Sequence, residues 1–297
     1  MIGENVERSK TKTGRVSGSL DVRQAVEMAC IMEVMAPKAG NVTPQKAFHD
    51  TTFYHFVLSG LAIGPVMSNG ENDSIGELVL KGVQETRKWV EVNTNLGIIL
   101  MFAPLVKAAF MGTDLQSDLG VVLNTATLND AQQIYRAINL ASPGGLGQAE
   151  EGDVKNTEKP LPLLEAMKHA SQWDSIAREY ATNFQITFSL TLPALIEQRK
   201  FSQDMLQAIT QTQLLTLSEL PDTLIARKVG KSRAEEVSNM ARKVLKAGGV
   251  YSSKGMNEYE AFDQALRKDG NRLNPGTTAD LLAAAVFVAI IKGEWVP

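Results

Sequence analysis

Residues 281–291, with the sequence LLAAAVFVAII, decide the fold class of this 297-residue chain. They form the longest apolar run in the sequence, and eleven residues are too few to span a bilayer. The run belongs to a predicted helix over about 277–292 that is apolar on every face. Because such a helix must be covered by other elements, it is typical of the centre of a globular helical protein.

Helical periodicity extends outward from this segment over nearly the whole chain. Apolar spacing predicts further helices over about 21–35, 51–67, 73–91, 97–111, 115–125, 129–141, 162–170, 174–198, 203–217, 222–228, 231–247 and 256–269. The alternation of a β-strand is nearly absent, and residues 121–127 are its one weak instance. We therefore predict an all-α fold, with a single multi-helix globular domain over 20–297 and a mobile polar tail over 1–19.

The composition excludes several classes of protein. Lys and Arg number 30 against 33 Asp and Glu, so the net charge of −3 argues against a nucleic-acid partner. A single cysteine, Cys30, excludes an internal disulfide and a cysteine-built zinc site. The polar first twenty residues do not resemble a signal peptide. We expect a cytoplasmic protein that binds no membrane, and the sequence leaves open whether it forms a homo-oligomer.

The first predicted helix carries a carboxylate on its apolar face. Val22, Val26, Ala29 and Glu33 follow one another at spacings of four, three and four residues, which puts them on one side of the helix. A carboxylate on such a buried or half-buried surface requires a cation, a metal or good hydrogen-bond donors. The residue types favour neither of two interpretations, a structural ion pair with another helix or a functional group.

The loop over 36–50 follows this helix and holds several polar residues. Pro37-Lys38-Ala39-Gly40 predicts a rigid, exposed turn that carries one cation. His49 and Asp50 come just before the next helix. Capping of that helix is the better interpretation of Asp50 alone, and a surface position is the better one for His49.

Three other loops could bind phosphate. The segment 93–97 (NTNLG) precedes an apolar helix, whose first backbone N–H groups are free to bind an anion or to be capped by Asn or Thr. The segment 142–147 (SPGGLG) lacks the ending of a P-loop and is a weak nucleotide signal. In 274–280 (NPGTTAD), Thr277 and Asp280 resemble a capping box, although Asp280 also suits a second functional carboxylate near the core.

Taken together, these loops resemble the triphosphoribosyl-dephospho-coenzyme-A synthase family. The resemblance covers about 21–297 and rests on the joint occurrence of several blocks: 33–42 (EVMAPKAGNV), 49–53 (HDTTF) with Phe56 and Ser59, 93–97 (NTNLG), 220–223 (LPDT) with Arg227, and 273–282 (LNPGTTADLL).

The resemblance implies an all-α, ATP-dependent transferase. In this family a ribose hydroxyl of a coenzyme-like acceptor such as dephospho-CoA attacks the ribose C1′ of ATP, and adenine leaves. It implies catalytic roles for Glu33, Asp50 and Asp280, and Mg²⁺ held with ATP by Glu33 and Asp50. It further implies that nucleotide contacts come from Lys38, Gly40, Asn41, His49, Asn93, Thr94, Asn95, Gly97, Arg227 and Asn274.

The chain departs from the family pattern at two places. Ala39 stands where the family has proline, and Asn95 and Leu96 stand where it has His and Lys. The lost cation predicts weaker but detectable nucleotide binding, and poor or absent triphosphoribosyl transfer to dephospho-CoA. The variant resembles a branch associated with tetrahydromethanopterin-linked metabolism. Two alternatives are therefore a related nucleotide-dependent enzyme of pterin-type cofactor biosynthesis and a non-catalytic helical binding protein.

Overall fold

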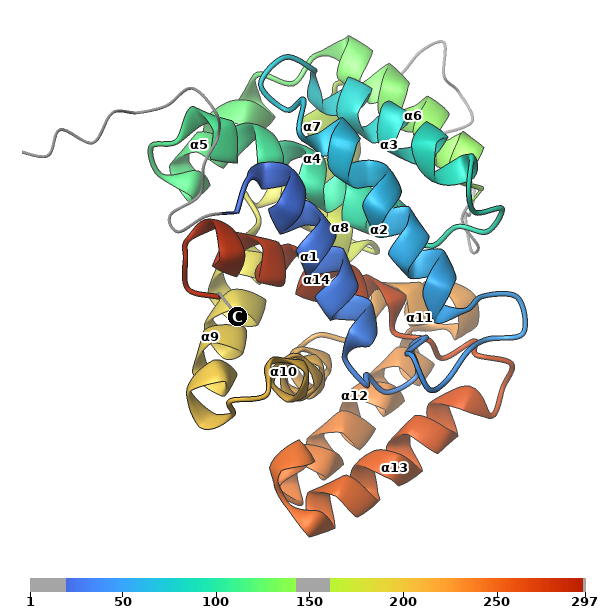
Figure 1. Cartoon of the computed structure of the whole chain (residues 1–297). Coiled ribbons are helices and arrows are strands. Elements are labelled where there is room, and N and C mark those ends of the chain that lie inside the picture. Colours follow the sequence, from blue (N-terminus) through green and yellow to red (C-terminus); the bar gives the residue numbers. More distant parts are fainter. Residues whose placement is uncertain (1–19, 143–160, 296–297) are drawn as a thin grey trace, which may run out of the picture.

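The computed structural model describes residues 20–142 and 161–295, which form an all-α protein (Figure 1). Its elements are α1 (Val22–Met35), α2 (Phe53–Met67), α3 (Ile75–Arg87), α4 (Leu96–Met111), α5 (Leu115–Asn124), α6 (Leu128–Ala141), α7 (Leu163–Ala170), α8 (Ser175–Ala181), the π-helical η1 (Thr187–Thr191), α9 (Leu192–Phe201), α10 (Met205–Glu219), α11 (Thr223–Val229), α12 (Lys231–Lys246), the 3₁₀ turn η2 (Gly249–Tyr251), α13 (Ser253–Arg267) and α14 (Gly276–Ile291).

The predicted fold class is confirmed. Across the described residues there is no strand, and an isolated β-bridge joins Thr43 to Lys46. Residues 121–124, where the sequence showed a weak strand pattern, belong to helix α5. The tail predicted over 1–19 and the loop 143–147 lie outside the described residues.

Helix α14 is the centre of the fold, as its apolar sequence predicts. Every residue from Leu281 to Ile290 is at most 1% exposed. The helix packs against α1, α4, α9 and α10, and Figure 1 shows it crossing the molecule behind α1. Burial of this many aliphatic side chains is the main source of stability for the helices around it.

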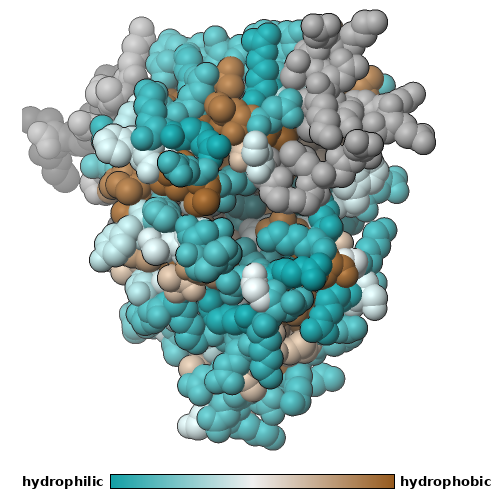
Figure 2. All heavy atoms as spheres, turned by 90° about the vertical axis from the view of Figure 1, so that its right-hand side faces the viewer, coloured by the Kyte–Doolittle hydropathy of each residue, from teal (hydrophilic) through white to brown (hydrophobic). Residues whose placement is uncertain are grey.

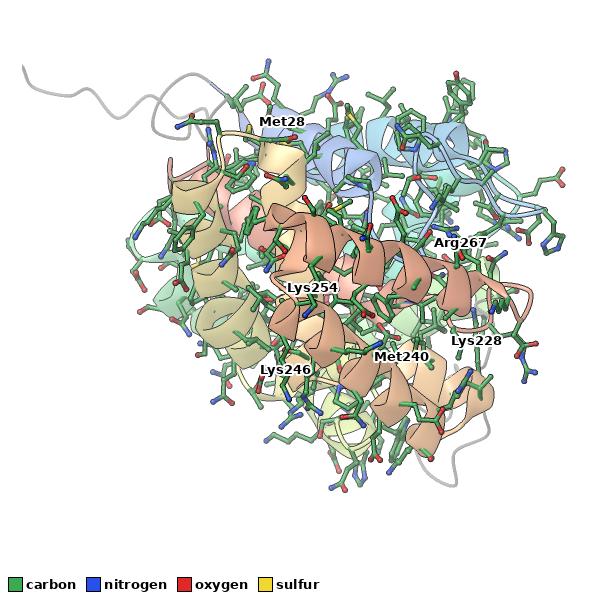
Figure 3. All side chains as sticks on the ribbon, turned by 90° about the horizontal axis from the view of Figure 1, so that it is seen from below. Met28, Lys228, Met240, Lys246, Lys254 and Arg267 are labelled. Carbon is green, nitrogen blue, oxygen red and sulfur yellow. The ribbon has the colours of Figure 1, made fainter. Side chains whose placement is uncertain are left out.

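The apolar interior consists of two clusters that meet near the end of α1. The larger one surrounds α14, and the smaller one joins α10, α11, α12 and α13. Figure 3 looks onto this smaller cluster from below, with Met240 and Lys246 on α12 and Lys254 and Arg267 on α13. Ala36 belongs to the larger cluster and Ala39 to the smaller, so the turn after α1 lies where the two meet.

The continuous helix predicted over 174–198 is wrong. The chain leaves α8 after Ala181, takes positive φ angles at Asn183 and Phe184, and resumes as η1 and α9. The buried Glu179 carboxylate accepts hydrogen bonds from the backbone N–H groups of Ile186 (2.8 Å) and Thr187 (2.7 Å), which the break leaves without helical partners. Apolar periodicity cannot register such a break, because both halves present apolar faces to the same core.

The helices in the described ranges differ from membrane-spanning helices in length and composition. None of them alone is long and apolar enough to cross a bilayer; α4 and α5 reach that length only as a pair bent by 115°.

Figure 2 views the molecule from the right-hand side of Figure 1. Hydrophilic side chains cover most of the lower half of this face, and the hydrophobic patches gather in its upper half.

Candidate active site

The end of α1 brings Glu33 and Lys38 together in the interior. After α1 ends at Met35, the turn folds back and places Lys38 Nζ 2.9 Å from Glu33 Oε1. The same ammonium donates to the carbonyl oxygen of Glu33. The two side chains are only 0% and 4% exposed, so the expected exposed position of Lys38 is wrong. Of the two interpretations of Glu33, the ion pair is present, although its partner comes from the adjacent turn and not from another helix.

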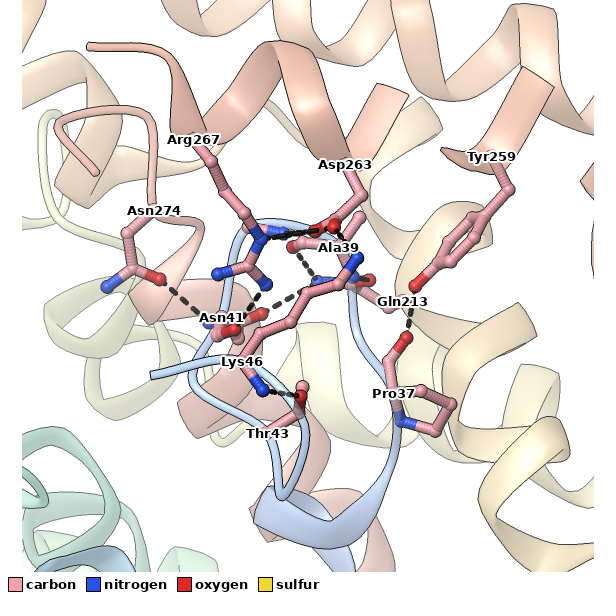
Figure 4. Close-up of polar contacts among 11 residues, drawn as sticks. Pro37, Ala39, Asn41, Thr43, Lys46, Gln213, Tyr259, Asp263, Arg267 and Asn274 are labelled. Carbon is pink, nitrogen blue, oxygen red and sulfur yellow. Dashed lines mark hydrogen bonds and ion pairs between the residues drawn. The ribbon is translucent and has the colours of Figure 1, made fainter. Parts of the chain in front are cut away.

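The residues after Lys38 are tied to the start of α14 and to α13 (Figure 4). Gly40 has a φ of 72°, a conformation that favours glycine, and a Cβ there would lie 2.8 Å from Leu266 Cδ1. Its N–H donates to Asp263 Oδ1 at 2.7 Å. Asn41 Nδ2 donates to Asn274 Oδ1 at 2.8 Å. Gly40, Asn41 and Asn274 therefore shape the site through contacts within the protein.

Asp280 lies where the first turns of α4 and α14 meet. A Cβ placed on Gly97 would overlap the carboxylate of Asp280, so the two residues are in direct contact. The predicted capping box is wrong, because Pro275 precedes α14 and no side chain caps it. Among the described residues the Asp280 carboxylate has no hydrogen-bond or ion-pair partner, which leaves its oxygens available to a ligand.

The pKa of Asp280 is raised well above its usual range. Burial is the main cause, and the negative charges of Glu33, Asp222 and Asp174 add to it, while Arg227 opposes it. These charges act on Asp280 only because they lie close to it. The structure thus brings Glu33, Asp280 and Arg227 of the predicted site into one region.

Asp222 and Asp174 complete this carboxylate cluster and were not predicted as site residues. Asp222 caps α11 and also accepts from the N–H (2.7 Å) and hydroxyl (2.8 Å) of Thr278 in α14. Asp174 caps α8 and forms an ion pair with Arg227. Both residues stand directly before a helix, and capping alone accounts for them in the sequence. Only the fold reveals that both caps face Asp280.

The segment before α4 mainly ties helices together. Asn93 Oδ1 accepts from Leu96 N at 3.1 Å, and Thr94 Oγ1 lies 2.6 Å from Ser59 Oγ. Asn95 is buried and donates to Thr86 Oγ1 at 3.1 Å. The capping interpretation therefore holds for Asn93 alone. Thr94 and Asn95 bond to α2 and α3, and Gly97 provides the contact with Asp280.

Asp50 and His49 lie at the protein surface. Their side chains are 49% and 84% exposed, and Thr51 Oγ1 donates to Asp50 Oδ1 at 2.9 Å. The expectation that Asp50 caps the next helix is wrong, because Thr52 is the N-cap of α2. Burial lowers the pKa of Lys228, while the charges of Asp222 and Asp50 act in the opposite direction. Asp50 and Asp222 therefore both lie near Lys228.

The described residues hold no cluster of side chains that could bind a metal ion by themselves. Within the part of the chain that the structure describes, no three His, Cys, Asp or Glu side chains are placed to hold a metal ion. Glu33, expected as a ligand, is already paired with Lys38. A cation in this region would therefore need oxygens from a bound ligand in addition to any single carboxylate.

A surface hollow of about 530 Å³ adjoins the cluster on its α11 side. Trp173, Thr223, Arg227, Lys231 and Glu235 are among the residues that line it. A second hollow, of about 620 Å³, shares Trp173 and Lys231 with the first and is also lined by Glu165, Lys168 and His169.

Comparison with known proteins relates the chain to one enzyme family. Residues 19–296 match the family model described as CitG, ATP:dephospho-CoA triphosphoribosyl transferase. The chain is 23% identical to the "probable 2-(5''-triphosphoribosyl)-3'-dephosphocoenzyme-A synthase" of Malonomonas rubra, over 93% of this chain and 89% of that protein. It is 27% identical to the protein of the same name from Pseudomonas fluorescens, over 75% and 69%.

A solved structure agrees with these sequence matches. The crystal structure named for a triphosphoribosyl-dephospho-CoA synthase of Archaeoglobus fulgidus superposes with a TM-score of 0.64 and 27% identity. The match covers 80% of this chain and 99% of that one.

Proposed function

Because the chain belongs to the ATP:dephospho-CoA triphosphoribosyl transferase family, a family of transferases, we propose that it moves the triphosphoribosyl group of ATP to a ribose hydroxyl of dephospho-CoA. The bond between the ribose C1′ and adenine breaks, a bond from C1′ to the acceptor oxygen forms, and adenine leaves. The observation that most supports this proposal is the Asp280 carboxylate, which has a raised pKa and no partner among the described residues.

Asp280 is the proposed general base. As the acceptor hydroxyl attacks C1′, its proton passes to the carboxylate, and a base with a raised pKa takes up a proton better than an ordinary Asp. The negative charges of Glu33, Asp222 and Asp174 around it also favour positive charge at an oxocarbenium-like ribose. Arg227 is the proposed contact for a phosphate oxygen on the opposite side of the cluster, where it now pairs with Asp174.

Mg²⁺ is proposed as the companion of ATP. The donor set suits it, because Mg²⁺ is commonly bound by one or two carboxylates together with substrate phosphates. Of the two carboxylates expected to hold it, the half-exposed Asp50 is the better candidate, because Lys38 already neutralises Glu33. A bound Mg²⁺ would offset the charge of the triphosphate, while the residues of this chain hold the ribose and take the proton.

The departures at Asn95 and Leu96 do not remove this site. Leu96 belongs to the larger apolar cluster, and Asn95 bonds inward to Thr86. Restoring the family lysine at 96 would therefore bury a charge, so we do not expect that substitution to raise activity. Near the carboxylate cluster, Arg227 and Lys228 are the proposed phosphate contacts.

The proposal is tested by incubating the protein with Mg-ATP and dephospho-CoA. We expect free adenine in the chromatogram and, in equal amount, dephospho-CoA heavier by one triphosphoribosyl group in the mass spectrum. ATP with each component omitted in turn is the control. Adenine release without the heavier product would reject the transfer, and so would the absence of both.

A further inference from the structure

Two hollows lie next to each other on the α11 side of the carboxylate cluster, and together they form a depression. They share Gln172, Trp173 and Lys231, which stand between α7 and α8 and at the start of α12. Each has a volume of several hundred Å³ (about 530 and 620 Å³), which is the usual range of small-molecule sites. We call this depression the Trp173 hollow.

An exposed aromatic ring lines the depression. Trp173 is 48% exposed, although a ring of this size is usually well buried in a folded protein. Base stacking on an aromatic side chain contributes about 1–3 kcal/mol per base in nucleic-acid complexes and does not depend on the identity of the base. The exposed face of Trp173 is thus suited to a purine ring.

Basic side chains line the same depression as this ring. Lys168, His169 and Lys231 line the hollow, and none of them forms an ion pair among the described residues. Glu165 and Glu235 also line it, so its net charge is nearly balanced. Phosphates are nevertheless favoured, because unpaired lysines can turn toward a bound anion while the exposed glutamates turn away.

The hollow reaches the proposed reaction centre through α11. Thr223 lines it and donates to Thr277 Oγ1 at 3.2 Å, three residues before Asp280. Arg227 also lines it, and its charge acts on the pKa of Asp280. A ligand with its base at Trp173 can therefore extend toward Asp280 along one wall.

We propose that the Trp173 hollow is a binding subsite for a phosphorylated adenine nucleotide, with the base stacked on Trp173 and phosphates held by Lys231 and Lys168. The proposal rests on the proposed transfer reaction. Both of its substrates, ATP and dephospho-CoA, have this chemistry, so the test must distinguish donor from acceptor.

Steady-state kinetics provide the first arm, with ATP and dephospho-CoA varied separately. Trp173→Ala is expected to raise KM for one of the two nucleotides about tenfold, and Trp173→Phe to restore most of the loss. Trp89→Ala is the matched control, because Trp89 is also exposed (65%) but lies beyond the end of α3. Equal kinetics for Trp173→Ala and Trp89→Ala with both nucleotides would overturn the subsite.

Tryptophan fluorescence provides the second arm and does not depend on catalysis. In Trp89→Phe, the remaining tryptophans are Trp173 and the fully buried Trp295. Titration with ATP alone and with dephospho-CoA alone, excited at a wavelength that adenine does not absorb, should quench the signal with the nucleotide whose KM changes. The added substitution Trp173→Phe should abolish the quenching. Quenching by neither nucleotide would overturn the subsite, whereas missing adenine release with intact quenching would reject only the transfer reaction.

Discussion

At the scale of single residues, the position of Asp280 depends on the missing side chain of Gly97. A methyl group at residue 97 would overlap the Asp280 carboxylate and push it from its place. Alanine is favoured over glycine inside a helix by about 1 kcal/mol, so the fold should tolerate Gly97→Ala. We expect adenine release to fall at least about tenfold, with little change in the thermal midpoint.

The matched control is Gly120→Ala, which changes a glycine within α5 where the nearest foreign atom lies 3.5 Å from the added carbon. A Gly97→Ala variant as active as Gly120→Ala would show that the reaction does not need Asp280 where it now lies.

Lys38 stabilises the fold because it neutralises Glu33 inside the protein. Lys38→Ala leaves a buried carboxylate without a partner, and loss of one partner of a buried pair costs about 3–5 kcal/mol. Lys88→Ala removes a lysine of an exposed pair and should cost less than about 1 kcal/mol. Urea unfolding measures both. Adding Glu33→Gln should recover part of the stability lost in Lys38→Ala, and a loss no larger than in Lys88→Ala would contradict the buried pair.

At the scale of elements, α10 and α13 hold the turn after α1 from two sides (Figure 4). Gln213 of α10 bonds both the N–H and the C=O of Ala39 at 2.9 Å. Asp263 of α13 accepts from Gly40 N and from Lys46 Nζ. Although burial opposes it, hydrogen bonds from Arg267 and Lys46 hold the pKa of Asp263 below its usual range.

Removing this clamp should loosen the turn. Asp263→Ala leaves the buried Gly40 N–H unpaired and removes an ion-pair partner from Arg267, which we expect to cost about 2–3 kcal/mol. Limited proteolysis should then cut within 37–50 sooner than in the wild type. Asp269→Ala, at an exposed site, is the control. Equal cleavage rates in the two variants would show that α13 does not hold the turn.

The break between α8 and α9 gives the fold a specific pH dependence. Burial raises the pKa of Glu179 from 4.5 to about 7, so the folded state binds this proton more tightly than the unfolded chain. The resulting stability is full below pH 4.5 and is lost as the pH rises through 7, by up to about 3 kcal/mol. Between pH 5 and pH 8, the free energy of unfolding measured in urea should change less with pH for Glu179→Gln than for the wild type. An identical pH dependence of the unfolding free energy in the two proteins would contradict a raised pKa of Glu179.

The helices could be predicted from the sequence where their apolar residues form a clear run or a periodic face. The predicted ranges match α4 and α14 within one residue at each end, because an apolar run next to Gly or Asn marks its own limits. The break after Ala181 was not predictable, since it depends on Glu179 accepting backbone donors that follow it.

At the scale of the whole molecule, the candidate site is assembled from segments that lie far apart in the sequence. The sequence, aided by the family resemblance, identified Glu33, Asp280 and Arg227, which the fold brings together. It gave no means to see that Lys38 points inward or that Asp222 and Asp174 face Asp280. Burial and charge proximity are properties of packed helices, and helical spacing alone does not contain them.

We propose that Asp280 carries the chemistry of triphosphoribosyl transfer. The most direct test is a single-turnover measurement of adenine release from Mg-ATP and dephospho-CoA by the wild type and by Asp280→Asn, across a range of pH. The wild-type rate should fall as the pH drops below the raised pKa of Asp280, because the base becomes protonated. Asp280→Asn should bind Mg-ATP but release adenine at least about 10²-fold more slowly, without that pH dependence. An Asp280→Asn rate within about threefold of the wild type, less than 1 kcal/mol in activation free energy, would contradict the account.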